Sequence, residues 1–300
     1  MRRLDVPHRG VTLVGALFAL GFLVAQSGLL SPAIAAATVG TGSCGAIYLE
    51  PCTGATVNIG DNSCNGNYAC NNKITGDVGA GSCIGTQACR YNTGTIGDRS
   101  CIGNDVCAQS SGTIGADSCK GDNACIDNTS TIGDDSCTGI FACYLNRGDI
   151  GADSCTGTAA CQYNTGTIGA GSCTSDSACV GFGPPPPKAN KPPEVASVGT
   201  GSCTDAYSCY YFVGSVGDGS CTYDSACETK KAHIGDGSCN GLDACYLDPL
   251  TKGANKVVSI GDGSCNGDSA CEDTTNNIGT GSCNSANICE GLKGKIGDNK

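Results

Sequence analysis

The sequence has almost none of the bulky side chains that fill an ordinary hydrophobic core. Its 300 residues include no tryptophan, one methionine, five phenylalanines and ten tyrosines, so aromatic residues make up 5% of the chain. Glycine, by contrast, occurs 47 times. A chain of this length would normally bury large aliphatic and aromatic residues in one or two domains. The composition excludes such a core and requires another source of cohesion.

Positive charge and histidine are also scarce. Lys and Arg number 17 against 28 Asp and Glu, for a net charge of −11, and the two histidines are His8 and His233. No basic patch suited to nucleic acid is visible. His233, beside Lys230 and Lys231, has no nucleophile or orienting partner at a recognisable spacing. We therefore expect no catalytic residues and no nucleic-acid partner.

Cysteine is abundant where these other residues are lacking. There are 26 cysteines, an even number, and all lie beyond the N-terminal segment. This usage indicates a disulfide framework formed in an oxidising compartment. The C-x5-C spacing differs from the C-x2-C spacing of thiolate metal sites, and histidine ligands are nearly absent. We predict no metal ligands and no cofactor-binding residues.

Residues 1–37 have the pattern of a secretory signal peptide. Arg2, Arg3 and Arg9 provide a basic start, an apolar run follows from Val11 to Val24, and small residues end the segment. We expect its removal, which leaves no stable membrane span. An uncleaved membrane anchor is the alternative, because the apolar region approaches the length that crosses a bilayer. Either way the mature chain is expected outside the cell or at its surface.

From Val39 onward one short pattern repeats. Its clearest form is Ile260–Cys271, IGDGSCNGDSAC, and the two hexads [IV]GxxSC and xxxxxC return thirteen times, once for each pair of cysteines. Five consecutive repeats keep an 18-residue period; they start at Ile96, Ile114, Ile132, Ile150 and Ile168. A fixed period of this length is typical of solenoids, in which each unit stacks on its neighbours. We predict one solenoid from residue 38 to residue 300.

Two insertions interrupt the period without changing the register that follows. They cover residues 180–197, which include four prolines from Pro184 to Pro187, and residues 246–259. Both fall in the third hexad of a repeat, so we expect surface loops there and no domain boundary. The prediction is an all-β fold, a parallel β-helix of about 13 coils with 18 residues per coil and one disulfide per coil.

Glycine and aspartate recur just after the aliphatic residue of each repeat. Gly tolerates positive φ and Asp hydrogen-bonds nearby backbone, so we interpret Asp98, Asp134 and Asp262 as corner residues. Calcium is the cofactor that a row of such aspartates in successive coils could bind. Ala or Thr replaces Asp in other repeats, as at Ala116, and this breaks any continuous ladder of ligands.

The hexad [IV]GxxSC resembles the hexapeptide repeat of left-handed β-helix acyltransferases. One hexad in three follows that pattern, so the resemblance implies the coil and not the enzyme activity. A narrow interior then needs a small filler, and paired cysteines can provide it. This arrangement is similar to the beetle antifreeze β-helix, in which cysteines six apart staple each coil. The tandem repeat as a whole resembles cysteine-rich secreted repeat proteins.

We predict a disulfide within each coil, between a cysteine and the next one along the chain. The alternative places Ser and Ile inside and bridges cysteines of adjacent coils, because adjacent Ser and Cys on a strand cannot both point inward. The predicted pairs are Cys44 and Cys52; Cys64 and Cys70; Cys83 and Cys89; Cys101 and Cys107; Cys119 and Cys125; Cys137 and Cys143; Cys155 and Cys161; Cys173 and Cys179; Cys203 and Cys209; Cys221 and Cys227; Cys239 and Cys245; Cys265 and Cys271; and Cys283 and Cys289.

These features together predict a structural or adhesive rod, a non-catalytic scaffold whose partner is an extracellular surface, a matrix or another copy of the chain. Tyr210, Tyr211 and Phe212 form the candidate contact surface. Ice binding is the alternative function, since Thr-x-Thr pairs such as Thr93 and Thr95 form a file over several coils. Arg147 and Asp149 interrupt that file.

Overall fold

The structure is a computed structural model, and it describes residues 37–45, 57–71, 74–181, 197–253, 256–292 and 294–300. The chain divides into two compact units, Met1–Ala35 and Ala36–Lys300, and every described residue belongs to the second. The described residues contain no helix. This part of the chain is therefore all-β.

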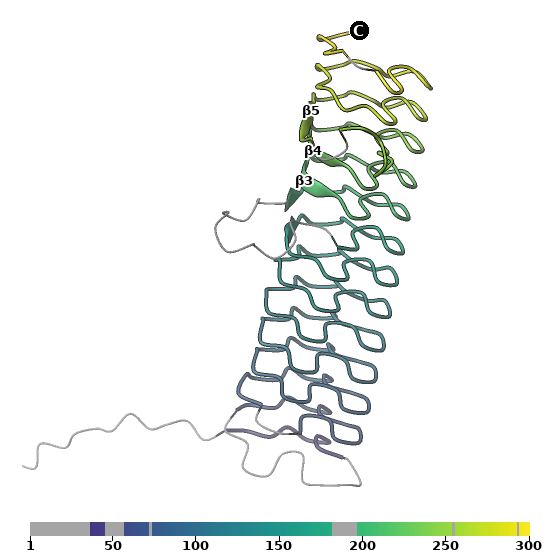
Figure 1. Ribbon diagram of the computed structural model, residues 1–300. Coiled ribbons are helices and arrows are strands. Elements are labelled where there is room, and N and C mark those ends of the chain that lie inside the picture. The colour runs from purple at the N-terminus through teal and green to yellow at the C-terminus, as the bar shows by residue number, and fades with distance from the viewer. Residues whose placement is uncertain (1–36, 46–56, 72–73, 182–196, 254–255, 293) are drawn as a thin grey trace, which may run out of the picture. The chain divides into compact units, whose positions relative to one another are not determined.

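Five short strands form one parallel sheet in chain order. They are β1 (Thr167–Ile168), β2 (Ser197–Val198), β3 (Val213–Val216), β4 (Lys231–Ile234) and β5 (Val258–Ile260). Each strand pairs with the next strand along the chain, as Figure 1 shows for the labelled strands. Parallel pairing of consecutive strands requires the chain to complete a turn between them. The fold is accordingly consistent with a β-solenoid, and we use "coil" for one such turn.

Single parallel bridges extend this pairing to both sides of the sheet. One file of bridges runs from Val39 through Ile59, Val78 and Ile96 toward β1, and continues beyond β5 through Ile278 to Ile296. The β-branched residues of this file are buried except near its two ends. Val and Ile suit such positions because their stiff side chains pack well on a pleated surface.

The glycine after each of these aliphatic residues is needed because adjacent coils approach closely. A Cβ atom on Gly97 would lie 2.6 Å from the backbone nitrogen of Ala116 in the next coil. Gly97 also donates its N–H to the carbonyl oxygen of Ile114, at 2.8 Å. A larger residue would push the two coils apart and break this ladder.

Ser and Cys at the end of the first hexad are both buried. Ser118 and Cys119 have no exposed surface, and the backbone of Cys119 has a left-handed φ of 55°. Side chains alternate between two faces only in extended backbone, so the turn at cysteine brings both side chains to the interior. The expectation that one of the two must point outward is therefore wrong.

The buried serines form a hydrogen-bonded ladder through the coils. The Ser118 hydroxyl donates to the carbonyl oxygen of Gly133 at 2.8 Å, and it accepts the N–H of Ser136 at 3.2 Å. Ser136 repeats both contacts with Gly151 and Ser154. Each buried hydroxyl thus has a donor and an acceptor in neighbouring coils, which removes the cost of burying it.

No described cysteine is free, and every bridge between two described cysteines lies within one coil. Each bridge joins residues six apart with a Cα–Cα distance of 5.5 to 5.9 Å, in the usual range for disulfides. The alternative of bridges between adjacent coils is wrong for these pairs. Cys52 lies outside the described residues, so the predicted Cys44–Cys52 pair is not described. The predicted signal peptide lies outside them as well, apart from residue 37.

A second polar ladder closes the coil three residues after the second cysteine. Asn146 is buried; its Nδ2 donates to Oδ1 of Asn128 at 2.7 Å, and its Oδ1 accepts from Nδ2 of Asn164 at 2.8 Å. The same amide donates to the carbonyl oxygen of Gly148, at 2.8 Å. These amides satisfy one another and the corner backbone, and they fix the position of the turn.

The two predicted insertions are described in part. Residues 182–196 and 254–255 are outside the described residues. In the second insertion, Asp273 of the next coil accepts the N–H of Asp248 at 2.9 Å and the hydroxyl of Thr251 at 3.0 Å. A single carboxylate therefore attaches the start of this insertion to the adjacent coil.

Candidate functional surface

The exposed aromatic rings all lie on one segment of the coil. This segment, which we call the cysteine segment, runs from the first cysteine of a pair to two residues beyond the second. It contains every exposed aromatic side chain of the described residues: Tyr68, Tyr91, Phe141, Tyr163, Tyr207, Tyr211 and Tyr223. The aromatic residues that the structure describes therefore lie mainly on its surface, along the cysteine segments of successive coils.

Six rings form two clusters on this edge. Tyr144 packs edge to face against Phe141 and Tyr163, with centroid distances of 5.7 and 5.9 Å. Tyr210 packs in the same way against Tyr207 and Tyr211, at 5.5 and 4.4 Å. We call these six residues the aromatic edge. Such pairs hold the orientation of rings that would otherwise rotate freely in water.

The predicted contact surface Tyr210, Tyr211 and Phe212 needs one correction. Tyr211 is exposed and Tyr210 half-buried, but Phe212 is fully buried. Phe212 lies three residues after Cys209, at the coil position that Asn146 and Asn164 fill elsewhere, so its ring replaces an inward-facing amide. Sequence reasoning missed Tyr207, although its place two residues before Cys209 matches that of Phe141 before Cys143.

The phenol of Tyr210 is held in its neutral form. Burial raises the pKa of Tyr210 above its ordinary value, and a side-chain hydrogen bond with Tyr211 raises this pKa further. A neutral phenol can both donate and accept hydrogen bonds. This pair therefore presents an apolar ring and a hydroxyl donor side by side.

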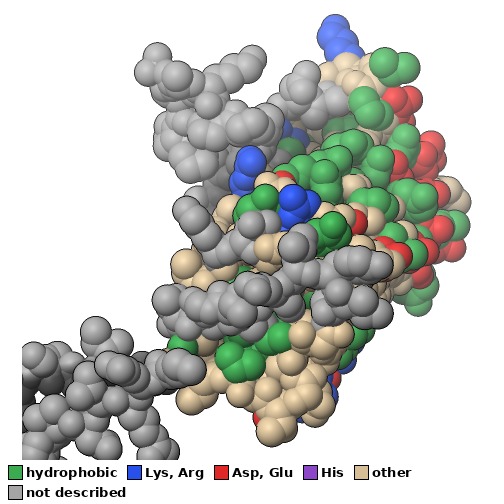
Figure 2. All heavy atoms as spheres, turned by 90° about the horizontal axis from the view of Figure 1, so that it is seen from below, with side chains coloured by type: hydrophobic (Ala, Val, Ile, Leu, Met, Phe, Trp, Pro, Cys, Tyr) green, Lys and Arg blue, Asp and Glu red, His purple; other side chains and the backbone are tan. Residues whose placement is uncertain are grey.

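Acidic side chains dominate the cysteine segments that follow. Burial raises the pKa of Asp243, and the nearby carboxylates Glu272, Asp224 and Asp268 raise it further. Burial likewise raises the pKa of Glu228. Figure 2 shows acidic side chains gathered beside hydrophobic ones along one side of the face in view. Crowding of like charges makes this region unfavourable for an anionic partner.

Asp117 is the one described carboxylate held in ion pairs. Arg99 of the preceding coil contacts it through its guanidinium, and Lys120 reaches it at 2.8 Å. The hydrogen bond from Arg99 lowers the pKa of Asp117 to about 2. The pairs are exposed, so they add little to stability.

The corner aspartates have a structural contact between coils. Oδ1 of Asp98 accepts the N–H of Ala80 at 2.8 Å, and Oδ1 of Asp134 accepts that of Ala116 at the same distance. The prediction of corner residues placed these bonds within the local turn, whereas the acceptor serves the preceding coil.

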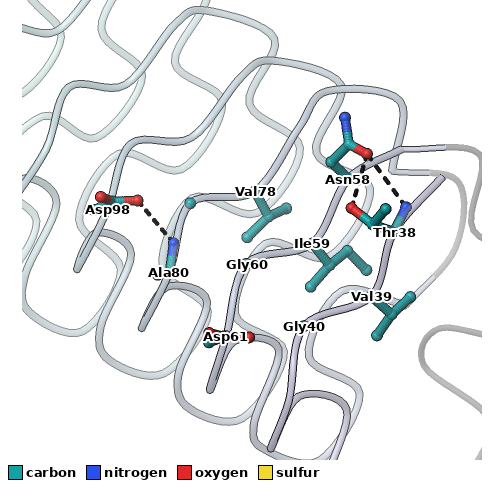
Figure 3. A pocket seen from close by; sticks show the side chains of 11 residues that line it. Thr38, Val39, Gly40, Asn58, Ile59, Gly60, Asp61, Val78, Ala80 and Asp98 are labelled. Atoms are coloured by element: carbon teal, nitrogen blue, oxygen red, sulfur yellow. Dashed lines mark hydrogen bonds between the residues drawn. The ribbon is translucent and has the colours of Figure 1, made fainter. Parts of the chain in front are cut away.

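A shallow hollow lies over the first coils of the described chain, with a volume of about 550 Å³. Val39, Gly40, Ile59, Gly60 and Val78 line it with aliphatic side chains and bare backbone, as Figure 3 shows. Its polar groups are already used, since Asp98 and Asn58 accept N–H groups of neighbouring coils. It contains no pairing of a nucleophile with a base.

His233 has one described partner, the hydroxyl of Ser215. The Oγ of Ser215 lies 2.9 Å from Nδ1 of His233, in register across β3 and β4. Both side chains lie on an open strand face, and among the described residues no carboxylate bonds to this imidazole. A serine and histidine alone, without an orienting acid or an oxyanion site, are an incomplete hydrolytic arrangement.

Lys230 is the one charged residue that the described chain buries completely. Its Nζ donates to the carbonyl oxygen of Thr274 at 2.9 Å. Burial lowers the pKa of Lys230 to about 7, although the carboxylate of Asp273 opposes this shift. Lys230 takes the inward coil position occupied by Asn164 and Phe212 elsewhere. The sequence gives no signal of this, because the neighbouring Lys231 looks equivalent.

Four trios of cysteine sulfurs lie close enough together to hold a metal ion geometrically. All of these cysteines are bridged in the structure, so none offers a thiolate ligand. The trios are Cys64, Cys70 and Cys83; Cys107, Cys119 and Cys125; Cys125, Cys137 and Cys143; and Cys173, Cys179 and Cys203.

No helix among the described residues is long and apolar enough to cross a membrane. In comparisons with known proteins, a family model described as a domain of unknown function (DUF7640) matches three stretches, residues 24–121, 91–206 and 208–300. No curated protein and no solved structure shows a significant match. The three matches fit the tandem repeat, and they bring no activity with them.

Proposed function

We propose that this chain, which belongs to the DUF7640 family, is a rigid and non-catalytic scaffold that acts outside the cell or on its surface. One observation carries the proposal: the polar and sulfur groups of the repeat are used to join coils or close them. Ser136, Asn146 and Asp134 all bond across coils, and Cys137 is bridged to Cys143. The repeat therefore forms the structural framework, and the exposed side chains on its surface are the groups that can bind a partner.

The finer architecture belongs to the same proposal. We infer about 13 coils of 18 residues, each with one disulfide, from the thirteen returns of the motif. Bridges such as Ile96 to Ile114 and Ile114 to Ile132 support the 18-residue step in the regular part of the chain. Disulfide mapping and an experimental structure test the coil number.

The compartment follows from the chemistry of the core. Twenty-six cysteines are stable as disulfides in an oxidising environment and would be reduced in most cytosols. Residues 1–37 supply the matching signal, and cleavage after Ala35 or Ala37 would release the solenoid. Partners are then an extracellular surface, a matrix or another copy of the chain.

Localisation of the C-terminally tagged protein in its source cells tests this proposal. We expect the tagged chain in the medium, the matrix or the surface fraction, with a new N-terminus near residue 38 and no free thiols. A reduced protein that keeps residues 1–37 and stays inside the cell would exclude the extracellular role.

Ice binding is a second candidate because the threonines predicted for it are exposed. Thr129 and Thr131 are exposed, and each has a buried residue next to it in the sequence. Thr165 and Thr167 have the same pattern, and they lie two coils further along the chain. Arg147 and Asp149 occupy the coil between. Thermal hysteresis by the purified protein would favour ice binding, and its absence together with unaltered ice recrystallisation would remove this candidate.

A further inference from the structure

We propose that the aromatic edge binds a neutral, extended polysaccharide built of β-1,4-linked pyranose units. The inference rests on the extracellular scaffold proposed above and names its ligand class. Sugars of this type present flat faces of C–H groups bordered by hydroxyls. Exposed tyrosines match both parts, because the ring stacks on the C–H face and the phenol hydrogen-bonds to hydroxyls.

The rings are not needed for the fold of the coil. Tyr163 and Tyr211 occupy the second position after the cysteine pair, where other coils have Gln109, Asp127 or Gly291. The backbone of both tyrosines is left-handed, with φ of 62° and 51°. Asn, Asp and Gly adopt this conformation more readily than a bulky ring. Tyrosines that are exposed, unfavourable for the backbone and also packed into ring clusters indicate a role at the surface.

The two clusters lie along one file of the solenoid. Tyr163, Gly181 and Tyr211 each donate a backbone N–H to the preceding coil, so they occupy equivalent positions in three consecutive coils. With adjacent coils about 4.8 Å apart, the backbones of Tyr163 and Tyr211 are separated by roughly 9.6 Å. This is comparable to the length of two pyranose units in an extended β-1,4-linked chain, which would place equivalent sugar faces over both rings.

Gly181 lies between the two clusters in this file and lets the ring of Tyr211 lie over its backbone. A Cβ atom there would lie 2.7 Å from Cδ1 and Cε1 of the Tyr211 ring, so the ring lies directly against this glycine. The edge-to-face contacts with Tyr144 and Tyr210 hold the two end rings. A prearranged surface of this kind loses little conformational entropy when it binds.

Charge favours a neutral polymer over an anionic one. The described cysteine segments from Cys137 to Tyr211 contain no Lys or Arg, while Asp205 lies two residues before Tyr207 and the backbone carbonyl of Asp176 accepts the N–H of Tyr207. Oδ1 of Asp176 accepts the N–H of Thr158 at 2.7 Å, which leaves its second oxygen to accept from a sugar hydroxyl. With a net charge of −11, the chain repels acidic glycans and tolerates neutral ones.

Depletion from solution by insoluble polysaccharide tests the proposal with the disulfide-bonded mature chain. The probes are microcrystalline cellulose and crystalline chitin, and soluble polygalacturonate serves as the anionic arm in an electrophoretic mobility assay. We expect binding to cellulose, chitin or both, and none to polygalacturonate. In the variant Tyr163→Asn with Tyr211→Asn, the Kd should rise at least tenfold. Asn suits left-handed backbone, so unfolding midpoints should be unchanged.

Tyr91→Asn is the matched control. Tyr91 occupies the same coil position, is 44% exposed against 48% for Tyr163, and has a φ of 59°, but it lies outside both clusters. It should bind like the wild type. Nitration with tetranitromethane gives a readout without mutation: cellohexaose or chitohexaose should slow nitration of Tyr163 and Tyr211, measured by peptide mass, and leave Tyr91 unaffected.

The proposal is overturned if the wild type binds neither neutral polymer, if it binds only polygalacturonate, or if the double variant binds as tightly as the control. A surface-located protein that fails these assays would retain the scaffold role and lose this ligand. An intracellular, reduced protein would instead contradict the scaffold role itself.

Discussion

Individual residues in this solenoid have interior positions that simple strand alternation does not predict. The left-handed backbone at Cys137 turns its side chain inward beside Ser136, so one dipeptide provides both a disulfide and a hydrogen-bonding hydroxyl to the interior. The serine contributes hydrogen bonds between coils, and the cysteine closes its own coil. Two adjacent residues therefore stabilise the molecule in different ways, one between coils and the other within a coil.

Removing one serine hydroxyl should destabilise the stack. In Ser136→Ala the carbonyl of Gly151 and the N–H of Ser154 lose their buried partner, and each unsatisfied group costs about 1 to 3 kcal/mol. We expect the free energy of unfolding in guanidinium chloride, under non-reducing conditions, to fall by at least 1 kcal/mol. Ser111→Ala, at an exposed position, should leave it unchanged. Equal losses in the two variants would contradict the ladder.

Lys230 should make stability depend on pH in the alkaline range. Burial lowers its pKa to about 7 from 10.5, so between these values the unfolded state holds a proton that the folded state has lost. Stability therefore rises with pH across this window, and the full penalty of burying the lysine is present below pH 7. The rise can approach about 1.4 kcal/mol per pH unit.

Lys230→Met should remove this dependence, because methionine fills similar space without a charge. We expect the variant to be more stable than the wild type at pH 7 and the difference to narrow by pH 9.5, measured by guanidinium unfolding. Lys231→Met, on the adjacent half-buried position, is the control, and its stability should depend on pH as that of the wild type does. A constant difference between Lys230→Met and wild type over this range would show that Lys230 keeps its ordinary pKa.

At the scale of elements, the coil is predictable from the sequence where the repeat is regular. Ile114 and Gly115 specify a parallel β-bridge and a close approach of adjacent coils, and the six-residue spacing of Cys119 and Cys125 suits a disulfide within one coil. The period of two in a strand could not reveal the left-handed cysteines, because that rule assumes extended backbone. Under that rule, adjacent Ser and Cys compete for one interior position.

Other elements depend on contacts between coils and gave no local signal. Asn146 forms its ladder with residues 18 positions away on both sides, and an isolated asparagine reads as an ordinary turn residue. The two tyrosines before Phe212 suggest a surface position for it, yet its coil position is that of Asn146 and it is buried. Position within the coil, and not residue type, decides which side chains are buried.

Loss of one disulfide should loosen one coil and its neighbours. Cys137→Ala with Cys143→Ala opens a short loop, worth about 2 to 3 kcal/mol by the chain-entropy estimate. Because solenoid units contact only their neighbours, we expect faster amide exchange in residues 119–161 and unchanged exchange in residues 221–245. Exchange measured by mass spectrometry checks this. Equal acceleration at both places would indicate that the whole solenoid unfolds as one unit.

The whole molecule is acidic, with a net charge of −11, and its carboxylates are unevenly placed. The tyrosines of the aromatic edge and the crowded carboxylates around Asp243 both belong to cysteine segments, the first set in earlier coils and the second in later ones. The same position in successive coils thus carries different chemistry. A regular frame lets side chains at that position vary without changing the fold.

Asp243→Asn should stabilise the protein near neutral pH. The pKa of Asp243 is raised, chiefly by burial and then by Glu272, Asp224 and Asp268, so its ionised form is unfavourable in the folded state. Because the pKa of Asp243 is raised in the folded state, the folded protein takes up a proton at this carboxylate as pH falls through the raised pKa. Protonation removes the free-energy cost of keeping the ionised carboxylate in the folded state. The variant should therefore melt at a higher temperature than the wild type at pH 7, and the two melting temperatures should converge in acid.

Asp105→Asn is the control, since Asp105 shares the coil position and has a left-handed φ of 52° but lies outside this cluster. Thermal melting at pH 7 and at pH 3, with and without added salt, measures the effect; salt should reduce the difference by screening the three neighbouring carboxylates. An Asp243→Asn variant that melts below the Asp105→Asn control at pH 7 would show that this carboxylate is a structural ligand of the coil and not a source of repulsion.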